Sequence, residues 1–373
     1  MKTNFKKTLA LLGAMTFMIT AATACGDSKS DSSASSAAEQ SAESSSTKGE
    51  QNVGVLSVLN LSEKDYAVIG SRGDAAAHYL MDKGLVTANV SEEATCLENY
   101  SVNTVYHDTL DSMIMALESG TLNSAVLPLS TAEYLCKNND KLQTIYSIDK
   151  EKAVTSDDVN IQAAVNTLGT GYAFMFSDSS TQLRDDFDKA IDEMEADGTI
   201  NKLVKEYIDD IVTGGEIKPV TFENNGSKTV KVAVTGCLPP MDYVAPDGTF
   251  AGFNTAILAE IGKRLGVNIE LVQTDSVGRA AALSSGTADV VFWTRVDISM
   301  PGPPKFDEAQ SKKMEDLRKG NTGEKPDNMP DDELMDKLTA GGSPRMKEKM
   351  DMPEGTIVTD PYFKDFLTRV TLK

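Results

Sequence analysis

The sequence predicts an α/β fold made of two related units, on the basis of three observations. The chain has 373 residues, whereas single domains usually hold roughly 100–200, so two compact units are expected. Short apolar runs alternate with amphipathic helical patterns, which predicts mostly parallel sheets with helices on both faces. An octapeptide recurs as ALESGTLN at 116–123 and ALSSGTAD at 282–289. The repeat predicts the same helix-to-strand corner in each unit, with glycine supplying the turn out of the helix.

Charge and composition exclude several classes of function. The formal net charge is −20, and nucleic acids and anionic lipid surfaces require basic patches, so neither is an expected partner. The chain has two histidines, so no metal site built on histidine is expected, and no motif indicates a cofactor. A disulfide between Cys96 and Cys136 stays open, although free buried thiols are favoured.

The start of the chain predicts export. Residues 1–24 combine an n-region of lysines, an apolar run over 8–22 and small residues before Cys25, which is typical of a secretory signal peptide. The Ala-Thr-Ala-Cys ending resembles a bacterial lipobox, which implies lipidation of Cys25; a plain secreted protein is the alternative. Residues 25–52 are rich in serine and lack apolar periodicity, so we expect a disordered tether.

The first unit, residues 53–220, shows the alternation most clearly. An amphipathic helix is expected over 183–194, since its apolar residues share one face, and Asp197-Gly198 should end it. A second helix should follow over 200–211, and a linker over 213–227. The remaining strands are expected at 53–59, 103–107, 124–129, 144–148 and 172–177, and the remaining helices at 75–83, 109–118 and 131–137.

The second unit, residues 226–373, repeats the pattern. Asn254 is the expected N-cap of a helix that Gly266 closes. Strands are expected at 229–236, 268–274, 288–294 and 359–373, with a helix over 279–284. Residues 299–355 are highly charged and rich in Gly and Pro, so a surface insertion with one or two short helices is expected there.

Two stretches carry a family resemblance. The segment KVAVTGCLPPMDYVAPDGTFAGFNTAILAEIGKRLGVNIELVQTDSVGRAAALSSGTADVVF, followed later by TDPYF, resembles the first lobe of the bacterial extracellular solute-binding proteins of family 3. GVLSVLN and the "aDGTi" element of EADGTINKLVKEYI resemble that family's second lobe. The resemblance implies a type II periplasmic-binding-protein-like fold, with two α/β lobes and a hinge cleft.

The two lobes occur in reversed order relative to that family. A single, circularly permuted two-lobed protein is the favoured interpretation, because each unit is too short to close a complete cleft alone. Two truncated tandem copies are the alternative. In a permuted protein, the helices of 180–211 should contact the second unit, and the strand near 365–373 should run at the hinge.

The resemblance implies a ligand held between the lobes, and we expect binding residues where strands end. Arg295 would grip a carboxylate bidentately, and Trp293 or Tyr243 would cover the ligand. Pro128 stands where the family often has an aspartate for an α-amino group, which leaves recognition of ordinary amino acids open. The complete set of expected ligand-binding residues is Arg295, Thr294, Trp293, Tyr243, Asp242, Ser130, Thr131 and Asn60.

Together these features predict a monomeric, lipid-anchored extracytoplasmic protein that delivers an amino acid or related carboxylate to the permease of an ABC importer. Its membrane contact would be the lipid anchor only. No catalytic arrangement is evident, so the chain is not expected to be an enzyme. A dehydratase-like enzyme on the same fold and a ligand-sensing lipoprotein are the alternatives.

Overall fold

The computed structural model describes residues 49–294 and 352–373, except residues 62, 92–94, 98, 99, 227 and 246. The predicted signal peptide, the lipidation site Cys25, Arg295 and nearly all of the predicted insertion lie outside the described residues. Among the described helices, none is long and apolar enough to cross a membrane.

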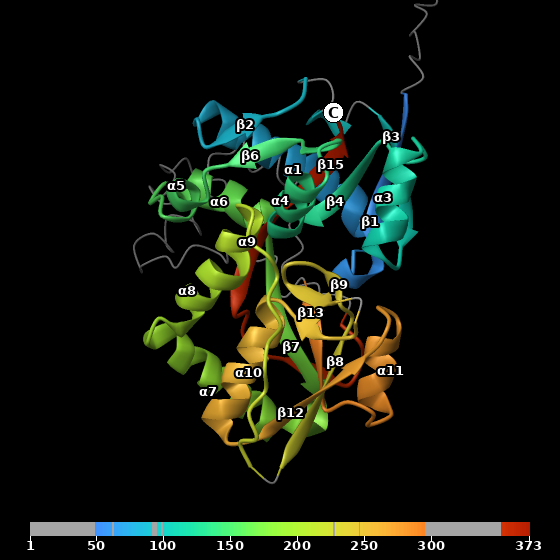
Figure 1. The fold of residues 1–373 in the computed structure, drawn as a ribbon. Helices are drawn as coiled ribbons and strands as arrows, with labels where there is room; N and C mark the ends of the chain where they lie inside the picture. The colour runs from blue at the N-terminus through green and yellow to red at the C-terminus, as the bar shows by residue number, and fades with distance from the viewer. Residues whose placement is uncertain are drawn as a thin grey trace, which may run out of the picture. The chain divides into compact units, whose positions relative to one another are not determined.

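Strands and helices alternate along the described chain (Figure 1). The first part forms β1 (Glu50–Leu56), η1 (Ser57–Leu59), α1 (Glu63–Asp82), β2 (Val86–Ala88), β3 (Ser101–His107), α3 (Leu110–Glu118), β4 (Ser124–Pro128), α4 (Leu129–Asn138), β5 (Leu142–Thr144), β6 (Tyr146–Ile148), α5 (Lys150–Val154) and α6 (Val159–Leu168). The middle forms β7 (Gly169–Ser177), η3 (Asp178–Ser180), α7 (Thr181–Ala196), α8 (Thr199–Val204), η4 (Lys205–Asp209) and α9 (Asp210–Val212). The last part forms β8 (Thr229–Val234), β9 (Cys237–Leu238), β10 (Asp242–Val244), β11 (Phe250–Ala251), α10 (Phe253–Leu265), β12 (Asn268–Gln273), α11 (Gly278–Ser284), β13 (Val290–Thr294), β14 (Thr356–Val358) and β15 (Phe363–Leu372).

The main sheet consists of two segments with the same strand order. In the β1 segment, β1 pairs in parallel with β3 and β4, and β15 runs antiparallel between β4 and β5. In the β8 segment, β8 pairs in parallel with β12 and β13, and β7 runs antiparallel between β13 and β14. The predicted α/β fold class is confirmed, with one antiparallel strand inserted in each segment.

The antiparallel strand of each segment comes from the other part of the chain. β7 follows the elements of the β1 segment in sequence but pairs with β13, and β15 follows the elements of the β8 segment but pairs with β4. The first residues of β15 also pair with β7, from Phe363 opposite Tyr172 to Phe366 opposite Gly169. The two segments therefore share hydrogen-bonded strands.

Helices cover both faces of the β8 segment. Val290 and Phe292 of β13 belong to the large core that also contains Phe187 of α7 and Ile257 of α10. The alternate residues of β13 belong to a second core formed with α11. Figure 1 shows α7 and α10 side by side, with α11 across the sheet from them. A strand buried on both faces explains the unbroken apolar sequence of β13.

The repeated octapeptide forms the same corner in both segments. Gly120 and Gly286 adopt positive φ values of 75° and 70° as the chain leaves α3 and α11. At the next strand, the Asn123 side chain accepts the backbone N–H of Asn52 at 2.8 Å, and Asp289 accepts that of Lys231 at 2.9 Å. Each of these two short polar side chains therefore fixes the start of its strand against the central strand of the segment, β1 or β8. Their role is structural.

Several sequence predictions needed correction. Residues 50–52 were expected in the tether but belong to β1, and the expected strand at 57–59 is a 3₁₀ turn. Asn254 is not an N-cap, because α10 begins at Phe253 after Gly252, and the Asn254 side chain instead accepts the Tyr362 hydroxyl at 2.6 Å. Sequence periodicity missed α5 and α6 entirely, and it placed the start of α1 twelve residues too late, at 75 rather than 63.

Candidate functional site

The carboxyl ends of four parallel strands define the candidate site. Ser57–Leu59 follows β1, and α4 follows β4 in the β1 segment. In the β8 segment, Thr235 follows β8 and Thr294 ends β13. Ligands of open α/β sheets usually bind beyond such strand ends.

Asn60 and Thr294 connect the two segments at this place. The Asn60 backbone lies in the left-handed region with φ 55°, which an asparagine tolerates better than most residues. Its side-chain amide donates to the Thr294 hydroxyl oxygen at 3.3 Å, and the Thr294 hydroxyl donates to the Val58 carbonyl at 2.9 Å. Two residues expected from sequence to bind a ligand therefore bind each other in this conformation.

Arg279 is the residue that sequence reasoning missed. Its side chain, 1% exposed, donates to the carbonyls of Ser276 and Phe292 at 3.1 Å within the β8 segment. It also crosses to the β1 segment, donating to the Val58 carbonyl at 3.2 Å and to Asn60 Oδ1 at 2.9 Å.

The guanidinium of Arg279 also lies over the Trp293 ring, 4.6 Å from its centroid. Trp293 itself is 7% exposed and belongs to the core formed with α11. Burial lowers the pKa of Arg279 to about 10, which still leaves the side chain cationic at neutral pH. The sequence signal available for this role was that Arg279 is the one charged residue of α11, whose other residues are small or apolar.

Asp242 is buried beneath the same region. Its carboxylate accepts the backbone N–H groups of Thr235 and Gly236 at 2.9 and 3.0 Å and the Thr235 hydroxyl at 2.7 Å. Burial raises the pKa of Asp242, while these hydrogen bonds and the charge of Arg279 act in the opposite direction. The carboxylate thus holds the turn after β8, and the structure gives it no exposed face.

The start of α4 is occupied by an acid of the chain itself. Asp365 of β15 accepts the Ser130 backbone N–H at 3.0 Å and the Ser130 hydroxyl at 2.6 Å. The anion expected at this helix N-terminus is therefore an internal carboxylate, 3% exposed, that sequence reasoning did not assign. Two neighbouring hydroxyls, of Thr131 and Tyr172, are buried and have no hydrogen-bond partner among the described groups.

Tyr243 lies in β10, half-buried, in a three-stranded sheet with β9 and β11. Burial and, to a lesser degree, Tyr243 raise the pKa of Tyr134 of α4. Arg279 thus contacts both Asn60 and Trp293, and Asn60 binds Thr294 directly. Ser130 instead binds Asp365.

Comparison with known proteins identifies the β8 segment. Residues 230–296 match the family described as bacterial extracellular solute-binding proteins, family 3. The resemblance predicted from the sequence motifs is confirmed over this stretch, which contains Asp242, Tyr243, Arg279, Trp293 and Thr294. The family match covers residues 230–296, and the α/β strand order is observed in both segments.

A curated relative and two solved structures are also similar. The chain is 31% identical to the L-cystine-binding protein TcyJ of Escherichia coli strain K12 over 102 residues, which is 26% of this chain and 38% of that protein, so it matches less than two fifths of the relative. The ancestral amino-acid-binding protein AncCDT-1 is 12% identical over 87% of this chain and 82% of its own, with a TM-score of 0.32. The ligand-binding core of GluR0, solved with L-glutamate, is 9% identical over 87% of this chain and 85% of its own, also with a TM-score of 0.32.

Proposed function

We propose that this chain, a family 3 solute-binding protein by its match over residues 230–296, captures a small polar ligand between its two sheet segments and delivers it to the permease of an ABC importer. An amino acid or related carboxylate is the proposed ligand class, and Cys25 is the proposed lipid anchor at the outer face of the membrane. The L-cystine specificity of one relative makes a cystine-like amino acid the first ligand to test.

One observation carries the proposal: Arg279 and Thr294 of the β8 segment bind Val58 and Asn60 of the β1 segment at the carboxyl ends of the strands. These contacts are hydrogen bonds between a few polar groups. Such groups can exchange their partners for those of a ligand when two lobes move about a hinge. The connection through β7 and β15 gives that hinge two strands, and it supports one permuted two-lobed protein over two tandem copies.

We choose the proposed ligand contacts by asking which side chains at the site already have hydrogen-bond partners within the protein. Arg279 makes four hydrogen bonds in the described structure, so we assign recognition of a ligand carboxylate to Arg295, which follows Thr294 in sequence. The buried hydroxyls of Thr131 and Tyr172 have no hydrogen-bond partner within the described part of the chain, and Thr131 follows Ser130, which binds Asp365. An ammonium group placed there would gain an acidic partner, which would replace the aspartate that Pro128 cannot supply.

Isothermal calorimetry and thermal unfolding of the purified protein test this proposal with L-cystine, L-glutamate, L-arginine and succinate. A ligand at a hundredfold excess over its Kd should stabilise the folded state by about 2.7 kcal/mol. Arg295→Ala should abolish binding of the ligand that responds, whereas Arg184→Ala in α7, where the arginine side chain is 30% exposed and binds Asp185, should retain it. Full binding in the Arg295 variant, or no response to any of the four compounds, would contradict the proposal.

A further inference from the structure

We propose a second ligand site, for a small organic carboxylate, in a cavity of the β1 segment. The cavity lies at the opposite end of the strands from the candidate site between the segments. The cavity encloses about 260 Å³ next to Gln51 of β1, Ser124 of β4 and Arg369 of β15. Gln51 and Ser124 stand at the amino ends of their strands, whereas the candidate site between the segments lies at the carboxyl ends. The two sites are therefore separated by the length of the sheet strands.

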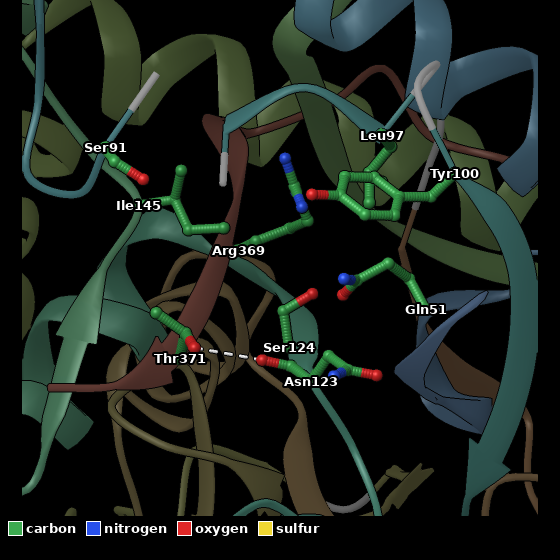
Figure 2. Close-up of a pocket in the computed structure, with 9 residues that line it drawn as sticks. All are labelled: Gln51, Ser91, Leu97, Tyr100, Asn123, Ser124, Ile145, Arg369 and Thr371. Atoms are coloured by element: carbon green, nitrogen blue, oxygen red, sulfur yellow. Dashed lines mark hydrogen bonds between the residues drawn. The ribbon is translucent and has the colours of Figure 1, made fainter. Parts of the chain in front are cut away.

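A buried hydroxyl in the wall of this cavity lacks a partner among the described residues. The Ser124 side chain is 3% exposed, and its hydroxyl has no hydrogen-bond partner among the described residues. A buried hydroxyl without a partner costs roughly 1–3 kcal/mol, so a bound group that satisfies it recovers this free energy. Figure 2 shows the Ser124 hydroxyl and the Gln51 amide directed toward the same central space.

The cavity contains one cationic group that can bind an anion. Arg369 is the only charged residue among the described residues that line it, and its side chain is 7% exposed. Nη2 of Arg369 donates to Asp74 Oδ1 at 3.3 Å and also to the Thr95 carbonyl, so both printed hydrogen bonds hold the same end of the guanidinium. A guanidinium fixed on one side is preorganised to bind a carboxylate on the other, with less side-chain entropy to lose.

The volume of the cavity and the polarity of its lining further restrict the class of ligand. Pockets for drug-sized molecules hold roughly 300–1,000 Å³, so this cavity suits a smaller molecule. Leu97 and Ile145 provide an apolar wall, and Tyr100, drawn beside Arg369 in Figure 2, provides a phenol. These groups fit a carboxylate with a short carbon chain, its charged end at Arg369 and Ser124 and its chain against Leu97 and Ile145.

Calorimetric titration of the purified protein with acetate, succinate and L-glutamate tests the site. Ser124→Ala and Gln51→Leu should each weaken binding about three- to tenfold, as expected for one lost hydrogen bond. Ser124→Ala should leave the urea midpoint unchanged or slightly raised, because it removes an unpaired buried hydroxyl. Gln143→Leu is the matched control; its side chain binds the Leu372 carbonyl outside the cavity lining, and binding should not change.

Two results would overturn the proposal. The first is an absence of binding for all three probes up to concentrations of about 10 mM, where even a weak millimolar site would be largely occupied. The second is binding that falls in Asn60→Ala but stays unchanged in Ser124→Ala and Gln51→Leu, which would locate the carboxylate between the sheet segments. That second result would leave the function proposed above intact, so the two proposals fail separately.

Discussion

Replacing Arg279 with lysine tests the polar connection between the two segments. The guanidinium serves four acceptors, two in each segment, and a lysine ammonium has three donors at a single point. The ammonium cannot reach both pairs, so we expect two acceptors to lose their partner. At roughly 1–3 kcal/mol for each unsatisfied buried group, Arg279→Lys should cost about 3 kcal/mol. For a folded unit of this size, that cost lowers the Tm by about 4 °C.

Urea unfolding followed by tryptophan fluorescence measures this cost directly. The chain has a single tryptophan, and Trp293 lies against the Arg279 guanidinium, so its emission reports on the region that is changed. Arg184→Lys is the matched control, since the Arg184 side chain is 30% exposed and the same substitution there should change stability by less than about 0.5 kcal/mol.

A double-mutant cycle separates the contact between segments from the contacts within one segment. Asn60→Ala removes the Oδ1 acceptor at 2.9 Å, so its cost should be smaller when Arg279 is already lysine. A loss below about 1 kcal/mol in Arg279→Lys, or fully additive costs in the double variant, would refute the view that this arginine couples the segments.

Three further predictions rest on other parts of the fold. Hydrogen bonding from Thr199, and then Arg264, lowers the pKa of Asp197 to about 2, so its stabilisation is present above the unfolded pKa of about 3.9 and is lost as pH falls toward 2. Asp197→Asn should therefore lower the urea midpoint at pH 7 and have progressively less effect below pH 4; a constant difference would contradict this. Gly120→Ala and Gly286→Ala should each cost about 1 kcal/mol by urea unfolding, because both glycines have positive φ with open space around them, and a difference above about 1 kcal/mol between them would disprove equivalent corners. Burial raises the pKa of Cys237 to about 11, so iodoacetamide at pH 8, followed by mass spectrometry, should label it about a hundredfold more slowly than an ordinary thiol; equal rates would show that the thiol is exposed.

The sequence predicted well those elements whose formation depends on nearby residues. The apolar face of α7 predicted a helix over 183–194, which the structure extends to Thr181–Ala196, and Asp197-Gly198 ends it with Gly198 at φ 78°. The helix before β13 and the strand itself were also placed to within two residues. Where helical periodicity was weak, as in α6 with the sequence VNIQAAVNTL, whose first four residues alternate apolar and polar, prediction failed.

The candidate site could be predicted only in outline. The strand-end rule brought Asn60 and Thr294 into the expected set, because it depends on topology alone. It could not identify Arg279 as a partner of Asn60, since the two residues lie 219 positions apart in the sequence. It also treated the α4 terminus as open to a ligand, although Asp365, 235 positions later than Ser130, occupies it.

The sequence by itself determined the α/β alternation, the paired glycine corners and the family resemblance of the β8 segment, because each depends on residues within one or two turns or strands of each other. The tertiary structure decided that β7 and β15 cross between the segments and that Arg279 links the two segments by hydrogen bonds. It also decided that a cavity lined by Ser124 lies in the β1 segment. These outcomes depend on which distant groups find partners when the chain closes, and a buried polar group is satisfied only by the groups that tertiary packing brings to it.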